Sequence, residues 1–87
     1  MIKGVKGKTV ILDTQTKWVY IGRYERDDGT YIFLEDADAF DVSDTSMSKD
    51  EYIRMVKKDG LAPNRKRVSV LKAMVSAITL LDDIMEK

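Results

Sequence analysis

The residues of this sequence best suited to chemistry are cations, and they form two clusters. One cluster alternates with glycines near the N-terminus, and the other is a run of three residues after the single proline. Lysine and arginine side chains neutralise phosphates, so either cluster could make salt-dependent contacts with a nucleic-acid backbone. The alternative for both is ordinary solvated surface. The candidate phosphate contacts are Lys3, Lys6, Lys8, Arg65, Lys66 and Arg67.

Histidine and cysteine are both absent from the chain. Their absence removes the commonest general base, the commonest transition-metal ligand and any thiolate. Catalysis would depend on Asp, Glu, Lys or Tyr, and no constellation of these stands out. The acidic stretch 36–44 lacks the glycine and the final glutamate of an EF-hand loop, so we interpret it as structural or solvated acid. We therefore expect a non-enzymatic protein with no cofactor and no metal.

Length and composition indicate one small globular domain. The chain has 87 residues, 44% of them hydrophobic and 34% charged, with a net charge of zero. Zero net charge is unfavourable for binding nucleic acid unless the cations gather on one surface. No N-terminal signal sequence and no run long enough to span a bilayer is recognisable, and the lack of cysteine suits a reducing compartment. We expect a cytoplasmic protein that does not contact a membrane.

A β-hairpin over residues 17–36 is the element expected to position the site. Aromatic and β-branched residues flank the sequence Asp-Asp-Gly-Thr at 27–30, and such residues favour strands. The Asp-Gly step predicts a tight turn in which glycine supplies a positive φ angle. Five of the seven aromatic residues lie in this hairpin, so we expect the core there. Gly22 predicts a bend or a close backbone approach within the first strand.

A short helix is predicted within residues 48–59. Ser48 and Glu51 have the spacing of a capping box, and Gly60 can end the helix. A helix of this length is marginal alone, so its apolar stripe must pack against the rest of the domain. The segment from 68 to 85 is ambiguous: its apolar residues recur at helical spacing, yet it is rich in β-branched residues. Pattern alone leaves helix and strands almost equally favoured there.

Two stretches resemble the motifs of the Sm-like family, especially its bacterial Hfq branch. The first, Gly22 to Leu34, has the family's strand glycine, turn aspartate and following apolar strand. The second, Leu71 to Ile78, matches the second motif in its lysine, its serine and two β-branched positions. A short strand at Thr9 to Leu12 fits the family's first strand. The resemblance covers roughly two-thirds of the chain.

The resemblance implies a mostly β fold: a small, strongly bent, five-stranded antiparallel barrel, with the helix of 48–59 inserted between the third and fourth strands. It implies strands at about 67–73 and 75–81 in place of a C-terminal helix. Residues 1–87 then form a single Sm-like domain, with 1–8 as a flexible basic arm. Family subunits close into homo-oligomeric rings of roughly five to seven copies, which pairs the open edges of each sheet.

The resemblance also implies binding of single-stranded RNA, often uridine-rich, at the inner rim of the ring. In the family, a base stacks on an aromatic ring beside a lysine from the second motif. This chain departs from that pattern: Thr30 occupies the aromatic position, Tyr31 follows it, and Ala73 replaces the motif histidine. The residues carried over to the RNA site are Asp28, Gly29, Thr30, Tyr31, Lys72 and Ala73.

Two other interpretations remain open on the sequence. The chain could form an Sm-fold ring that serves only as a protein-interaction scaffold, with the inserted helix as the contact and no RNA bound. It could instead be an α+β module whose C-terminus is helical and which forms no ring.

Overall fold

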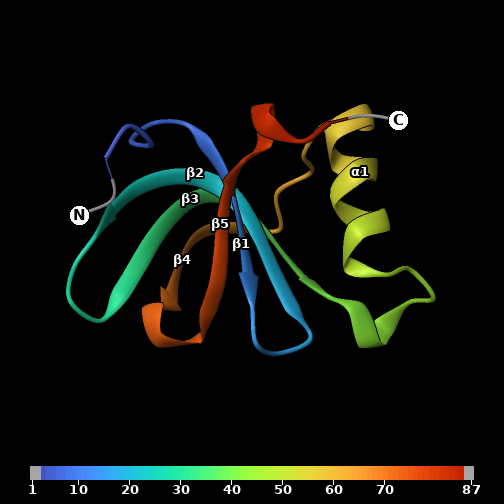
Figure 1. Ribbon diagram of the computed structural model, residues 1–87, viewed down its shortest axis with the longest axis horizontal. Helices are drawn as coiled ribbons and strands as arrows, with labels where there is room; N and C mark the ends of the chain where they lie inside the picture. The colour runs from blue at the N-terminus through green and yellow to red at the C-terminus, as the bar shows by residue number, and fades with distance from the viewer. Residues whose placement is uncertain (1–2, 86–87) are drawn as a thin grey trace.

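Residues 3–85 are described by the computed structural model of the chain, and they form five β-strands and one α-helix (Figure 1). The elements are β1 (Thr9–Thr14), β2 (Trp18–Asp27), β3 (Tyr31–Asp41), α1 (Lys49–Asp59), β4 (Arg65–Leu71) and β5 (Val75–Leu80). Single turns of 3-10 helix follow three strands: η1 (Val42–Asp44), η2 (Lys72–Met74) and η3 (Leu81–Asp83). Residues 1, 2, 86 and 87 of the expected domain lie outside the described residues.

All five strands belong to one antiparallel sheet in the order β4-β3-β2-β1-β5. The sheet is open, because β4 and β5 are its two edges and do not pair with each other. The prediction of a mostly β fold with one helix between the third and fourth strands is confirmed. Residues 65–71 and 75–80 are strands, so the helical alternative for the C-terminal segment is wrong. No described helix has the length and apolar character needed to cross a membrane.

The long hairpin of β2 and β3 is strongly curved (Figure 1), and it contains Gly22 in its first strand. The pairing register shifts there, and Asp36 and Ala37 of β3 together lie opposite this one glycine. Asp36 takes a positive φ of 48°, which identifies the extra residue as a β-bulge that increases the local twist. A Cβ on Gly22 would lie 2.6 Å from the Ala37 Cβ and 2.9 Å from its Cα. The predicted close approach at Gly22 is therefore confirmed.

Replacing Gly22 by alanine should lower the free energy of unfolding by about 1–3 kcal/mol, because the added methyl overpacks the bend against Ala37. Chemical denaturation of both proteins measures the difference. Gly29→Ala is the matched control, since Gly29 has no positive φ and a methyl group added there would meet no atom within 4 Å. Equal stability of the two variants would contradict the assigned role of Gly22.

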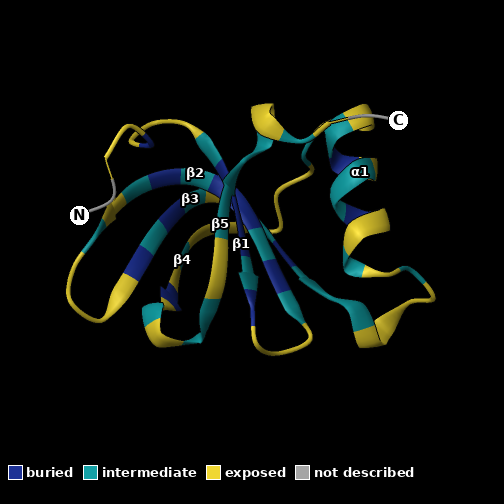
Figure 2. Cartoon of the chain, in the orientation of Figure 1, coloured by how far each residue is buried: buried dark blue, intermediate teal, exposed yellow. Residues whose placement is uncertain are grey.

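Two hydrophobic clusters cover opposite faces of the sheet, as neighbouring residues of β1 illustrate. Val10 and Leu12 belong to one cluster, and the intervening Ile11 belongs to the other. The first cluster fills the concave side with residues of β2, β3 and β4, and the second lies under α1. The expected core of hairpin aromatics is only partly realised. Tyr24 is fully buried, whereas the other four hairpin aromatics are half-buried or exposed, and aliphatic side chains fill most of the core. Buried stretches appear dark blue along β1, β2 and β3 (Figure 2).

Helix α1 begins and ends where the sequence predicts. The Ser48 hydroxyl accepts a hydrogen bond from the Glu51 N–H at 3.1 Å, and the Ser48 N–H donates to the Glu51 carboxylate at 3.0 Å. Donation from the Ser48 N–H, and after it from the Ser48 hydroxyl, holds the pKa of the Glu51 carboxylate below its usual value. At the other end, Gly60 has a φ of 93° and donates to the Val56 carbonyl at 2.8 Å. The predicted capping box and C-terminal glycine are thus confirmed.

One lysine ties the first turn of α1 to the sheet. The Lys49 ammonium donates to the Asp13 carboxylate at 2.8 Å and to two backbone carbonyls, Thr14 at 2.9 Å and Thr16 at 2.7 Å. These acceptors lie at the end of β1 and in the following turn, which are distant from α1 in sequence. The contact fixes α1 on the sheet face opposite the concave core.

Candidate nucleic-acid interface

The two turns that the sequence marks as a site lie against each other. The Lys72 N–H donates to the Thr30 carbonyl at 2.8 Å, and the Lys72 ammonium donates to the Asp28 carbonyl at 3.0 Å. Tyr31 and Leu71 pair across β3 and β4, so antiparallel pairing sets the start of β3 beside the end of β4. We call residues 28–31 together with η2 the two-turn site. It brings together Asp28, Thr30, Tyr31 and Lys72, with Ala73 next to Lys72 in η2.

The Asp28 carboxylate organises the turn between β2 and β3. Its Oδ1 accepts from the Thr30 N–H and from the Tyr31 N–H, both at 2.7 Å. The Asp28 N–H also donates to the Tyr31 carbonyl at 3.0 Å. The predicted positive φ at Gly29 is wrong, because the aspartate side chain holds the turn in place of a left-handed glycine. The backbone N–H groups of Tyr31, which has the larger effect, and of Thr30 lower the pKa of Asp28 below its ordinary value.

Acid should loosen this turn through Asp28. A carboxyl group whose pKa is lower in the folded state stabilises the fold above its unfolded pKa, and the stabilisation is lost as pH falls through the folded pKa. We therefore expect the Asp28 contribution to vanish as the pH drops below about 4. Thermal melts of the wild type and of Asp28→Asn, compared from pH 6 to pH 3, measure this. The variant should lose less stability with acid, and parallel curves would contradict the role of Asp28.

Asp27 adjoins the two-turn site and contacts its lysine, although no motif in the sequence selects this residue. Its side chain is only 3% exposed and lies 3.6 Å from the Lys72 ammonium. The hydroxyl of the buried Tyr24 donates a hydrogen bond to the Asp27 carboxylate. An acidic pair before glycine is typical of an exposed turn, so only the structure identifies this buried acid. Lys72 therefore faces a carboxylate and a carbonyl of its own chain.

Neither of the two predicted basic clusters is part of the two-turn site. Arg65, Lys66 and Arg67 are exposed and begin β4, whereas Lys72 follows the other end of that strand. The described part of the basic arm is anchored at β2. Val5 is buried in the concave core, and the Tyr24 N–H donates to the Lys8 carbonyl at 2.9 Å. The lysines of that arm are exposed, so they lie on the surface of a packed segment.

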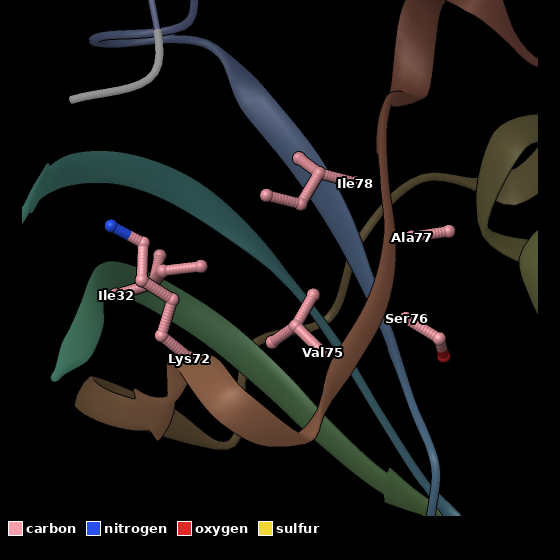
Figure 3. Close-up of a pocket in the computed structure, with 6 residues that line it drawn as sticks. All are labelled: Ile32, Lys72, Val75, Ser76, Ala77 and Ile78. Carbon is pink, nitrogen blue, oxygen red and sulfur yellow. The ribbon is translucent and has the colours of Figure 1, made fainter.

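An open cavity of about 330 Å³ lies beside Lys72 (Figure 3). The side chains of Val75 and Ile78 on β5 point into it, whereas Ser76 and Ala77 point away (Figure 3). Ile32 of β3 lines the cavity from the facing side. The lining is thus largely apolar, with one ammonium group near its edge.

Comparisons with known proteins give no further constraint. No family model matches this chain, and no curated protein matches it. The function must therefore be argued from the geometry of the two-turn site and from the surfaces next to it.

Proposed function

We propose that this chain is a non-catalytic, Sm-like protein that forms a homo-oligomeric ring and binds single-stranded RNA at the inner rim. The observation that carries the proposal is the contact between the turn at 28–30 and η2 through Lys72. These are the two segments that the Sm-like resemblance assigns to the RNA site, and Asp28 and Lys72 lie 44 positions apart in sequence. Their meeting supports the resemblance as a whole.

The open sheet supports assembly into a ring. The strands β4 and β5 are the two edges, and each edge strand presents backbone groups that no other strand within residues 3–85 pairs with. Pairing β4 of one copy with β5 of the next satisfies both edges, and repetition of this contact by rotation closes a ring. The strong bend at Gly22 brings the sheet toward the barrel shape that such a subunit requires.

The two-turn site offers RNA one aromatic ring and one ammonium group. Tyr31 is 40% exposed, which leaves part of its ring available for stacking. Lys72 follows Leu71, the partner of Tyr31 in β4, and its partly exposed side chain lies beside the cavity that Ile32 lines. The hydrogen bonds of Asp28 fix the backbone on which Tyr31 stands, so the ring is positioned before RNA arrives.

Two measurements test this proposal. Light scattering at micromolar concentration should give the mass of a ring of several copies, and a monomer would contradict the assembly. Titration with fluorescent oligo(U) at two salt concentrations should show binding that weakens as salt rises. Lys72→Ala should weaken this binding, while Lys58→Ala, at an exposed lysine of α1, should leave it unchanged.

A scaffold ring that binds protein and no RNA is the second candidate. It is favoured by one observation: Lys72 already faces the carboxylate of Asp27, so the two-turn site offers little unpaired positive charge. A ring mass in light scattering together with no salt-dependent binding of oligo(U) would support the scaffold.

A further inference from the structure

The outward face of β3 and β4 carries aromatic rings and arginines side by side. Ile32 and Leu34 are fully buried in the concave core, so the alternating residues Tyr31 and Phe33 point to the opposite face. Tyr31 pairs with Leu71, and Phe33 pairs with Ser69, which places the same alternation on β4. We call this surface the β3–β4 outer face. It consists of Tyr31, Phe33, Arg67, Ser69 and Leu71, with Arg26 of β2 beside Phe33.

The rings of this face are arranged for stacking. Tyr31 and Phe33 have centroids 6.2 Å apart and are tilted by 54°, so the two rings do not stack flat on each other. The Arg26 guanidinium lies 3.8 Å from the centroid of Phe33, which is a cation–π contact. Leu71 is 41% exposed and extends the apolar area across β4. Exposed aromatic rings on a sheet are a common platform for the bases of single-stranded RNA.

The charges of this face favour a polyanion. Arg65 and Arg67 are exposed, and within residues 3–85 neither forms an ion pair. The one acid opposite Arg67 is Glu35, which lies 3.5 Å from Arg23 and is thus partly neutralised. The two-turn site differs, because its lysine already faces Asp27. Positive charge that is available to phosphates therefore lies on the β3–β4 outer face.

The same alternation divides the basic run at the start of β4. Arg67 shares the outward face with Ser69 and Leu71, whereas Lys66 lies on the face of the buried Val70. Successive outward positions along a strand are roughly 6.6 Å apart, so Arg67 and Leu71 are separated by roughly 13 Å. A short extended segment of RNA could then contact the rings at one end of β4 and the arginines at the other.

We infer that the β3–β4 outer face is an RNA-binding surface, on which bases stack on Tyr31 and Phe33 while Arg26 and Arg67 contact phosphates. This inference rests on the proposed function, since it extends the RNA path from the two-turn site along β4. Tyr31 belongs to both surfaces, so the path is continuous. A second copy of the chain fits this face less well, because two such faces would bring arginines against arginines.

The test uses the full chain and a fluorescent oligo(U), with affinity measured by anisotropy at several salt concentrations. Phe33→Leu keeps an apolar strand residue but removes the ring, and it should weaken binding by about 5-fold to 100-fold. Tyr31→Leu should act in the same direction, while Tyr31→Phe should bind like the wild type. Arg67→Ala should reduce the salt slope by about 0.7, the loss of one phosphate contact. Lys66→Ala is the matched control and should leave both affinity and slope unchanged.

The outcomes separate this inference from the proposed function. Absence of salt-dependent binding by the wild type would overturn both. Wild-type binding together with unchanged affinity in Phe33→Leu and unchanged slope in Arg67→Ala would overturn the inference alone. An equal effect of Lys66→Ala and Arg67→Ala on the salt slope would also overturn it, because RNA would then not distinguish the two faces of β4. Light scattering of Phe33→Leu completes the set: a fall in particle mass would assign this face to contacts between copies and overturn RNA binding there.

Discussion

Replacing Tyr52 by alanine should release α1 from the sheet and lower the free energy of unfolding by about 3–5 kcal/mol. Tyr52 is 1% exposed and is the largest buried side chain of the helix. Its ring stacks on Phe40 with centroids 3.9 Å apart and an angle of 4°. Its hydroxyl donates to the Asp38 carboxylate at 2.5 Å. Alanine removes the ring from the second cluster and leaves Asp38 without this donor, so two losses add.

The pKa of Tyr52 shows how closely the phenol is enclosed. Burial and then the hydrogen bond to the Asp38 carboxylate raise this pKa far above its ordinary value. The phenol therefore stays protonated, and hence a donor to Asp38, even in strongly alkaline solution. Only a change of side chain, and not a rise in pH, should remove this contact.

Urea denaturation followed by circular dichroism measures the effect of Tyr52→Ala. Tyr52→Phe keeps the stacked ring and removes only the hydroxyl, so it should cost about 1–3 kcal/mol. Met55→Ala, at an exposed position of the same helix, should change stability by about 0.5 kcal/mol or less. If all three variants unfolded at the wild-type urea concentration, α1 would not depend on Tyr52 for its attachment.

Features encoded by neighbouring residues could be predicted from the sequence. The capping box needs only Ser48 and Glu51, three positions apart, and the helix end needs only Gly60. The bend at Gly22 is recognisable because glycine weakens a strand interior and usually occurs there only where the backbone bends or is closely approached. Each of these depends on local backbone chemistry, which the residue type and its close neighbours determine.

Features that depend on distant pairing could not be predicted from pattern alone. The apolar residues from 68 to 85 recur at helical spacing, yet pairing with β3 and β1 makes two strands of this segment, β4 and β5. Local pattern cannot contain this information, because the partners lie far away in the chain. Only the resemblance to the Sm-like motifs predicted the strands. The predicted conformation of Gly29 was wrong for a different reason. A tight turn can be stabilised by a glycine with a positive φ or by hydrogen bonds from an aspartate side chain, and here Asp28 makes those hydrogen bonds.

The burial of Asp27 could not be predicted from the sequence either. Its sequence context, an acidic pair at a turn, is typical of solvated residues, and its burial arises only from tertiary contacts with Tyr24 and Lys72. The Sm-like motifs specify the predicted members of the RNA site, and Asp27 is not one of the positions that they specify. The same holds for the β3–β4 outer face, whose residues become neighbours only through strand register.

Replacing Asp27 by alanine should destabilise the fold by about 3 kcal/mol, at the lower end for a buried ionic partner. The side chain is 3% exposed, so its removal takes an acceptor from the Tyr24 hydroxyl, which belongs to a fully buried residue. Losing the ion pair with Lys72 costs less free energy, because the Lys72 side chain is 37% exposed and water can solvate its ammonium group. Chemical denaturation of the variant and the wild type gives the difference. Stability within about 0.5 kcal/mol of the wild type would show that the buried carboxylate contributes little.

Asp27→Asn should strengthen the binding of oligo(U), whereas Lys72→Ala should weaken it. The amide oxygen can still accept from the Tyr24 hydroxyl, so the variant should remain folded and lose less stability than the alanine variant. Its neutral side chain no longer offsets the charge of Lys72, which lies 3.6 Å away in the wild type. If Lys72 contacts RNA phosphates, oligo(U) should bind Asp27→Asn more tightly than the wild type and with a steeper dependence on salt. Unchanged affinity with reduced stability would mean that Asp27 and Lys72 only hold the two turns together, and that phosphates are bound elsewhere.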